Sequence, residues 1–399
     1  MRSGRRLAAL AVVVGGVAAC AVATPSPPAS SVSSAATFGS TAPSAAPMAT
    51  ASDASTGTLG DLGELLDIRS VSSEFTARVL EFASAGASII ASAAEQEGDD
   101  TAPDLFVIPS STGEPELAWR NPDRDHSIVR LVGDGSMIAF VDMPVTGEAE
   151  WTLRLIPEEG ATPIILDQLV DDPDVPTLVP SVTAYWPFVA WTAFDRGPDG
   201  AVSQLLYAQS PDWKPTLIAE RLATDAELWF PSLHGTQLVY TELAYSEDRS
   251  TDERAVWLTA IDDPDVPERL DSSGLATMPV INQFDIAWKE GEQGFHQLNW
   301  GSMERRVAET GASLPMWEQE EVNYPSAGTR YMTWWTSSQS RLAVWDGAQG
   351  IARVIVTYDS ADQRVLRAHV AGSLIAWLFV DESVEPGYSE IRYAVLVQG

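Results

Sequence analysis

One short pattern recurs at nearly constant spacing along most of this chain, and it constrains the fold more than any other feature. The pattern is a tight turn followed by a strand whose last residue is usually aromatic, as in the stretch from Gly133 to Phe140. Seven copies are found, and their ends are 48, 51, 49, 48, 46 and 43 residues apart. A period in this range indicates a repeat architecture. The copies end at Ser92, Phe140, Trp191, Tyr240, Trp288, Trp334 and Trp377.

Within each copy two large side chains flank a small one, which favours sheets that stack on one another. Side chains alternate between the two faces of a strand. In the copy that ends at Phe140, the aromatic ring therefore shares a face with Ile138, while Ala139 points the other way. The first copy, residues 89–92, lacks the aromatic residue and is aligned with the others at Ser92. Because each sheet has one bulky and one shallow face, each copy can fill its neighbour, as in the radial packing of a β-propeller.

We therefore predict an all-β fold, a β-propeller of seven blades with four short strands in each. A six-bladed ring is the alternative because the first copy is degenerate, and an all-β sandwich would require coincidental spacing. The last copy ends during its third strand, at residues 393–397. We expect residues 65–69 to supply the missing strand, so that pairing of the N- and C-terminal strands closes the ring and removes exposed sheet edges.

The first 19 residues have the features of a signal peptide rather than of a folded domain. Arg2, Arg5 and Arg6 precede an apolar run, Leu7 to Val17, that is short for a bilayer span. The run ends in Val-Ala-Ala-Cys, which resembles the bacterial lipobox, the site at which a cysteine thiol is lipidated. Cys20 is the only cysteine, so we expect lipidation there rather than a disulfide or a metal site. An ordinary secretory signal with an incidental cysteine is the alternative.

Residues 20–60 are the predicted tether between this anchor and the propeller, which we assign to residues 61–399. Ala, Ser, Thr and Pro dominate the tether, which has too little apolar bulk to offset the entropy lost on ordering. The expected location is the bacterial cell membrane, with the protein lipid-anchored through Cys20 and facing the extracytoplasmic side.

The charge of the chain limits its partners. It carries 56 acidic and 24 basic residues, a formal net charge of −32. This balance argues against nucleic acid, which requires a basic footprint, and against direct adsorption on anionic lipid. Most of the charge is explained by solubility, because an acidic surface keeps an extracellular protein dispersed.

The turn Gly133–Ser136, followed by the strand end Ile138–Phe140, resembles the repeat unit of TolB-like β-propellers. The other copies keep the strand end but mostly lose the Asp-Gly turn. The resemblance covers most of the predicted domain and implies an extracytoplasmic binding platform. That implication belongs to the family, since a blade motif specifies a fold and not a function.

Catalytic residues are hard to identify in this sequence. The histidines lie in different repeats without the spacing of a zinc site, and we interpret His234 and His369 as structural. Propeller glycosidases and polysaccharide lyases use acidic groups near the central channel. We therefore favour a binding or scaffolding module for a protein or envelope ligand, with a carbohydrate-active enzyme as the alternative. A cluster of carboxylates with raised pKa at the channel mouth would favour the enzyme, and an aromatic or charged rim the binding module.

Two copies of the hexapeptide Asp-Asp-Pro-Asp-Val-Pro begin at Asp171 and Asp262 and resemble calcium loops. Neither alone supplies the six or more oxygens that calcium needs, so we predict that both are proline-rich acidic turns. We expect no resident cofactor or metal ion, with calcium left open.

The predicted binding face follows from loop length. Loops between second and third strands emerge on one side of a propeller with the connections between blades, and here they are predicted to be long and acidic, notably at residues 192–202, 241–254 and 379–389. Variable loops on a rigid ring are where binding usually occurs. We expect this face to engage a cationic or polyhydroxylated partner, either a protein or a cell-envelope glycan. The candidate binding residues are Asp142, Asp195, Asp199, Glu247, Asp248, Glu290 and Asp381.

Overall fold

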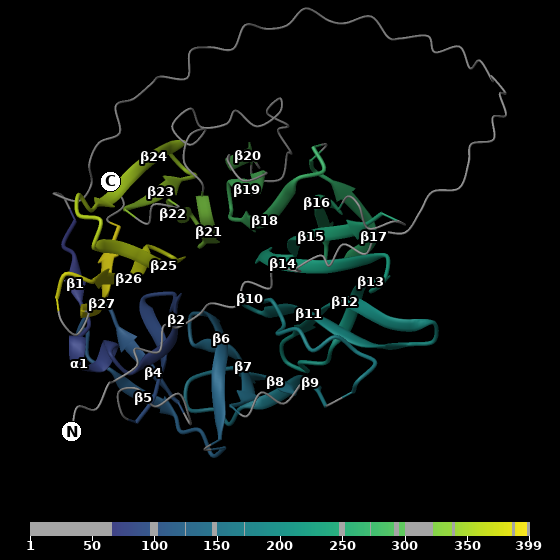
Figure 1. Ribbon diagram of the computed structural model, residues 1–399, viewed down its shortest axis with the longest axis horizontal. Coiled ribbons are helices and arrows are strands. Elements are labelled where there is room, and N and C mark those ends of the chain that lie inside the picture. The colour runs from purple at the N-terminus through teal and green to yellow at the C-terminus, as the bar shows by residue number, and fades with distance from the viewer. Residues whose placement is uncertain are drawn as a thin grey trace, which may run out of the picture. The chain divides into compact units, whose positions relative to one another are not determined.

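Seven antiparallel β-sheets make up the part of the chain that the computed structural model describes. The described residues are 66–95, 103–123, 125–145, 150–170, 172–246, 252–271, 273–290, 295–299, 322–336, 340–384 and 388–396. All of them belong to the unit Gly57–Gly399. Figure 1 shows the sheets arranged around a common centre, each with one strand innermost. The fold is the predicted all-β propeller, and seven sheets exclude the six-bladed alternative.

We number the sheets as blades 1 to 7 in chain order, and each runs outward from an inner strand. The inner strands are β2 (Val79–Ala85), β6 (His126–Asp134), β10 (Val182–Tyr185), β14 (Ala226–His234), β18 (Ala276–Ile281), β21 (Val322–Ala327) and β25 (Gln363–Ala371). The second strands are β3 (Ser88–Ala93), β7 (Met137–Pro144), β11 (Phe188–Gly197), β15 (Gln237–Tyr245), β19 (Asp285–Glu290), β22 (Tyr331–Thr336) and β26 (Leu374–Asp381). The third strands are β4 (Asp104–Pro109), β8 (Trp151–Ile156), β12 (Gly200–Gln209), β16 (Asp252–Ala260), β20 (Phe295–Asn299), β23 (Arg341–Asp346) and β27 (Tyr388–Val395).

Outer strands complete six of the seven sheets, and the described residues of blade 5 form three strands. The outer strands are β5 (Glu116–Trp119), β9 (Ile164–Leu169), β13 (Thr216–Leu222), β17 (Asp263–Arg269), β24 (Ile351–Thr357) and β1 (Arg69–Ser70). One short helix, α1 (Ser73–Thr76), precedes blade 1 and is capped by Ser72 Oγ, which accepts from the Phe75 N–H at 3.3 Å. Within the described ranges, no helix has the length and apolar character to cross a bilayer.

The ring closes between blades 7 and 1. Each inner strand contacts the inner strands of both neighbouring blades, and β25 contacts β2 in the same way. β1 pairs antiparallel with β27 as the outer strand of blade 7, with Arg69 opposite Tyr393 and Ser70 opposite Arg392. The predicted joining of the N- and C-terminal strands is confirmed, although pairing begins at the end of the predicted segment 65–69.

The aromatic residue at each strand end is buried between its own blade and the preceding one. Trp191 of blade 3 has no exposed surface and shares a core cluster with Leu153 of blade 2. Its indole Nε1 also donates to Asp167 Oδ2 of blade 2 at 2.7 Å. The small residue beside it, Ala190, lies in the cluster that contains Tyr240 of blade 4. The predicted filling of each shallow face by a bulky neighbour is confirmed. The buried strand-end aromatics are Phe140, Trp191, Tyr240, Trp288, Trp334 and Trp377.

The predicted alignment of the first repeat is wrong by one residue. Ile89 and Ala91 lie in the cluster shared with blade 7, whereas Ile90 lies in the cluster shared with blade 2. Ala91, and not Ser92, therefore occupies the position of the aromatic strand ends, because a shift of one residue moves every side chain to the opposite face. Phe82, directly opposite Ala91 on β2, places its ring in the same cluster and supplies the missing bulk.

The second and third strands run further than predicted, so the loops between them are shorter. β11 and β12 pair from Phe188 with Gln209 out to Gly197 with Gly200, which makes the predicted loop at residues 192–202 a hairpin. Backbone hydrogen bonds of a ladder need no apolar side chains, so pairing continues past the core into acidic sequence.

The two Asp-Asp-Pro-Asp-Val-Pro hexapeptides have different structures. Residues 172–175 of the first form a turn after blade 2, as predicted. Most of the second lies in β17, so the prediction of a turn is wrong for this copy. β17 is the outer strand of blade 4, and an edge strand tolerates Pro264 and Pro267 because one of its sides needs no ladder hydrogen bonds.

Glycine turns bring the blades close together at one end of the ring. Gly86 of blade 1 has a φ of +61°, and a Cβ on it would lie 3.3 Å from Gly135 Cα of blade 2. A Cβ on Gly328 of blade 6 would lie 3.0 Å from Ala371 Cα of blade 7. Larger residues would force these turns apart, so glycine allows the blades to converge here.

The two ends of the ring carry different connections. We call the end with the turns between inner and second strands, including residues 86–87, 135–136, 186–187, 235–236 and 372–373, the short-turn face. The opposite end carries the connections between blades and the second-to-third-strand loops, such as those at residues 198–199 and 382–384, and we call it the long-loop face.

Candidate functional site

Asp142, a candidate binding residue, lies at the long-loop face of blade 2 but is completely buried. Its Oδ1 is 2.8 Å from His126 Nδ1, and its Oδ2 accepts a hydrogen bond from Arg154 Nε at 2.6 Å. Arg154 also donates through Nη2 to Asp123 Oδ2 at 3.3 Å. Because both oxygens of Asp142 are occupied, this carboxylate ties β6, β7 and β8 together and presents nothing to a partner.

Asp123, His126 and Asp142 each place one ligand atom within 4.8 Å of the others, which is close enough for a metal ion. The guanidinium of Arg154 argues against such an ion, because it occupies oxygens of both carboxylates and brings a permanent positive charge beside them. Three ligand residues also fall short of the coordination that calcium prefers. We interpret the cluster as an ion-pair network.

Asp381, at the end of β26, is 8% exposed, and its hydrogen-bond partners also lie in its own blade. It accepts hydrogen bonds from Ser383 N at 3.0 Å, from Ser383 Oγ at 2.5 Å and from Gln363 Nε2 at 2.7 Å. The Ser383 hydroxyl, followed by Gln363, holds the pKa of the Asp381 carboxyl below its usual range. Glu290, at the end of β19, lies 3.4 Å from the indole Nε1 of Trp288.

Asp195 and Asp199 are exposed on the β11–β12 hairpin at the long-loop face. Beside them, the Arg196 guanidinium bridges Asp172 and Asp174, with Nη2 to carboxylate distances of 2.6 and 2.7 Å. The described candidates are thus spread over blades 2, 3, 5 and 7 and do not form one site. The candidates that lie outside the described residues are Cys20, Glu247 and Asp248.

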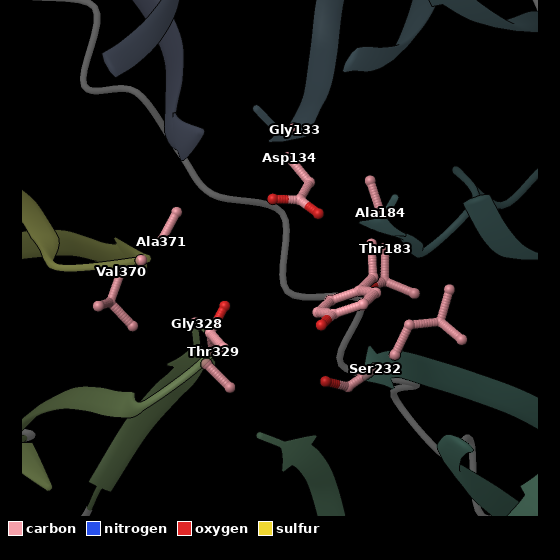
Figure 2. Close-up of a pocket in the computed structure, with 13 residues that line it drawn as sticks. Gly133, Asp134, Thr183, Ala184, Ser232, Gly328, Thr329, Val370 and Ala371 are labelled. Carbon is pink, nitrogen blue, oxygen red and sulfur yellow. The ribbon is translucent and has the colours of Figure 1, made fainter. Parts of the chain in front are cut away.

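A cavity of about 60 Å³ lies at the centre of the short-turn face. The inner ends of blades 2, 3, 4, 6 and 7 line it, so it sits on the ring axis. Figure 2 shows the carboxylate of Asp134 and the hydroxyl of Ser232 directed toward the same open space. Further hydroxyl groups come from Thr183, Tyr185 and Thr329. This site therefore brings polar groups from several blades to one point.

Of the described residues that line the cavity, Asp134 is the only one with a charged side chain. Its Oδ2 accepts a hydrogen bond from the backbone N–H of Trp186 at 2.7 Å, which joins the turns of blades 2 and 3. Burial and then the charge of Asp134 raise the pKa of the Tyr185 phenol, and burial lowers the pKa of His234, whose ring contacts Tyr185 at 4.7 Å. Both neighbours are therefore neutral near pH 7, and Asp134 sets the charge of the cavity.

Trp186 presents a half-exposed indole on the same face, outside the residues that line the cavity. The residue is 50% exposed, which is unusual for a tryptophan, and its ring packs edge-on against the buried Trp213 with 6.1 Å between centroids. Trp213 lies between β12 and β13, so the ring of Trp186 packs along blade 3, while its backbone N–H holds the Asp134 carboxylate.

The carboxylates with raised pKa lie elsewhere in the described part of the chain. Burial raises the pKa of Glu81, which pairs with Arg367 across blades 1 and 7, and of Asp167, which accepts the Trp191 indole. Glu81 is on the inner strand β2 and Asp167 on the outer strand β9, so the two do not form a catalytic pair.

His369 packs inside the fold. Its ring contacts Phe82 edge to face at 5.2 Å, and burial, followed by the charge of Arg367, lowers its pKa to about 4. A ring in this environment is neutral and structural at physiological pH, in agreement with the interpretation from the sequence.

The sequence marks Asp134 only as part of a turn, and the axial cavity is not evident from it. A signal was nevertheless present. The Gly133-Asp134-Gly135 turn is the closest match to the repeat unit, and the residues that precede the turn glycine in blades 1, 4 and 7 are Ala85, His234 and Ala371. An acidic residue at this position is thus peculiar to blade 2 among these four blades.

Comparison with known proteins supports the propeller fold. No family model and no curated protein matches the chain. Among solved structures, it is similar to the β-propeller domain of the Trilobed protease from Pyrococcus furiosus, with a TM-score of 0.54 and 9% identity over 78% of this chain and 93% of that one. That domain is described as having an open Velcro topology, whereas here β1 pairs with β27.

Two larger peptidases contain a similar propeller. A prolyl endopeptidase matches with a TM-score of 0.54 and 13% identity over 82% of this chain and 51% of that one. The acylaminoacyl peptidase of Pyrococcus horikoshii matches with a TM-score of 0.53 and 10% identity over 83% and 54%. The chain spans about half the length of these peptidases. At such identities the likeness defines a class, the β-propeller proteins, and no activity.

Proposed function

We propose that this chain is a membrane-anchored extracytoplasmic lipoprotein whose β-propeller is a binding or scaffolding module for a protein or envelope ligand. The apolar segment that ends in Val-Ala-Ala-Cys supports the anchor, and the Ala/Ser/Thr/Pro-rich segment after it supports a tether. The propeller would then face the cell envelope with the short-turn and long-loop faces open to partners.

One observation carries the choice of binding over catalysis: a single carboxylate is found among the described residues that line the axial cavity. Glycosidases of the common mechanisms need two carboxyl groups at the scissile bond, and Asp134 is the only acid among the described residues that line the cavity. Trp186 adds a half-exposed aromatic ring to the same short-turn face. At the long-loop face, the ion pairs of Asp142 leave it no free oxygen for acid–base chemistry.

A binding assay and an activity assay on the full chain test this proposal. Photo-crosslinking in native envelopes should recover one dominant partner, and incubation with envelope polysaccharides should produce no new reducing ends or unsaturated sugars. Sugar release by the wild-type chain that disappears in Asp134→Asn would instead establish the carbohydrate-active enzyme.

The anchor has its own test. Cys20→Ala removes the only thiol of the chain, so it should abolish incorporation of labelled fatty acid and leave either an unprocessed precursor or a released protein. Cys20→Ser is a matched control that keeps the size of the side chain but not the sulfur, and it should behave in the same way. Unchanged lipid labelling in either variant would contradict the lipobox.

A further inference from the structure

The axial cavity combines one fixed negative charge with neutral oxygen atoms. Asp134 Oδ2 is held by the Trp186 N–H at 2.7 Å, while Oδ1 has no hydrogen-bond partner within the described part of the chain. Ser232 and Thr329 approach the cavity from blades 4 and 6 (Figure 2). A ligand that satisfies Oδ1 must donate hydrogen bonds, and cationic donors make the strongest bonds to a carboxylate.

The volume of the cavity limits what can enter it. A single enclosed water needs roughly 10–15 Å³ of cavity, so a space of about 60 Å³ holds only a few atoms. That is enough for an ammonium or guanidinium group. A sugar ring or a drug-sized ligand needs several times more, since ligand pockets usually measure about 300–1,000 Å³.

The narrowness of the cavity favours a cation carried on a flexible stem. Lysine and arginine side chains carry their charge at the end of several methylene groups, so the charge can enter a cavity of about 60 Å³ while the backbone stays outside. The net charge of −32 would in addition attract basic partners from a distance.

We propose that the axial cavity receives one lysine or arginine side chain of a protein partner, with its cationic group on Asp134 Oδ1. This inference rests on the proposed binding function and adds the class of partner and its position. A free polyamine offers the same chemistry without a polypeptide, so the experiment must separate the two sources.

Calorimetric titration of the full chain makes this test. The probes are the blocked pentapeptide Gly-Gly-Lys-Gly-Gly, the same peptide with an Nε-acetylated lysine, and spermidine. We expect the first peptide to bind at least tenfold more tightly than the acetylated one, because acetylation removes the charge. The lysine peptide should displace spermidine from the cavity, whereas spermidine binding that resists the peptide would assign the site to a free polyamine.

Two variants isolate the cavity. Asp134→Asn removes the charge but keeps an oxygen for the Trp186 N–H, so the turn stays intact and the lysine peptide should bind at least tenfold more weakly. Asp359→Asn is the matched control, since it removes the same charge from the exposed connection between blades 6 and 7, and affinity should change by less than twofold. Thr329→Lys introduces a cation at an exposed rim position of blade 6 and should block binding without altering Asp134.

Three results would overturn the inference: equal binding of the acetylated and unacetylated peptides, undiminished binding to both Asp134→Asn and Thr329→Lys, or tight binding of spermidine or calcium that the lysine peptide cannot displace. If an envelope partner is still crosslinked under any of these results, the proposed binding function stands and only the axial lysine site fails.

Discussion

Two carboxylates at opposite ends of blade 2 show how differently one sheet can use the same chemical group. Asp142, at the long-loop face, is buried with His126 on one oxygen and Arg154 on the other. Asp134, at the short-turn face, is partly exposed and anchored by a single backbone N–H. A buried charge requires such compensation, whereas a partly solvated one retains oxygens for a ligand. Asp142 and Asp134 therefore differ in whether protein groups already occupy both carboxylate oxygens, and this difference makes the first structural and the second a candidate ligand-binding group.

Asp142→Ala should produce the largest effect, because it leaves the guanidinium of Arg154, which is only 19% exposed, without its closest partner. Breaking a buried ion pair costs about 3–5 kcal/mol. Urea unfolding of the full chain measures the loss. Asp199→Ala, on an exposed hairpin, is the control and should change the free energy of unfolding by less than ~0.5 kcal/mol. If the two variants unfolded at similar urea concentrations, Asp142 would not have the structural role that distinguishes it from Asp134.

Asp167→Asn should have a smaller effect that depends on pH. Burial raises the pKa of Asp167 in the folded state above its unfolded value, so between the two values only the unfolded chain is ionised. The folded state binds more protons in this window, and wild-type stability therefore falls as pH rises through it. Asparagine does not titrate and keeps one oxygen to accept from the Trp191 indole, but it loses the acceptor for the Gln168 N–H, which costs stability equally at every pH.

The measurement for this variant is a series of melting temperatures between pH 3 and pH 8. The stability of Asp167→Asn relative to the wild type should rise from about pH 4 upward and level off once the wild-type carboxyl is ionised in both the folded and the unfolded state. A stability difference between the two chains that does not vary over this range would show that the carboxyl is not destabilised by burial.

Asp134→Asn should have the smallest effect on stability, within ~0.5 kcal/mol of the wild type, because the acceptor for Trp186 N–H is retained. Thermal unfolding of the same samples used for ligand titration gives the value. If this variant were destabilised as strongly as Asp142→Ala, Asp134 would be a structural residue and the two ends of blade 2 would not differ in kind.

The architecture could be predicted from the sequence because it depends on periodicity. The spacing of residues such as Trp191 and Trp377 favoured seven sheets over six, and the alternation of large and small side chains predicted how they pack. The error at residues 89–92 arose where the aromatic signal is absent. Aligning the repeats on their turn glycines would have given the correct register. Ala91 lies five residues after Gly86, just as Phe140 lies five residues after Gly135.

The candidate site could not be predicted in the same way, because a single sequence does not show which acidic residues pair with basic side chains in the folded protein. Asp142 and Asp195 are both acids near the ends of second strands, yet only the first is buried beside an arginine. That pairing depends on Arg154 lying on the adjacent strand β8, within reach of β7. Similarly, Asp134 meets Trp186 only because two turns, 52 residues apart, converge on the axis.

The short pairing of β1 with β27 has a mechanical consequence. Tension applied through the chain before Leu66 reaches the propeller at Arg69 and Ser70, the two residues that pair with β27. Arg69 also donates to the carbonyl of Ser110 at 3.1 Å, so the load is divided between blades 7 and 1. In a propeller that is tethered at its N-terminus and pulled through a ligand on its axis, this seam would yield before any four-stranded blade. The force at which β1 detaches would then measure a few hydrogen bonds, because the buried cluster that joins blades 7 and 1, with Val71 and Phe75 against Ile391, lies further along the chain.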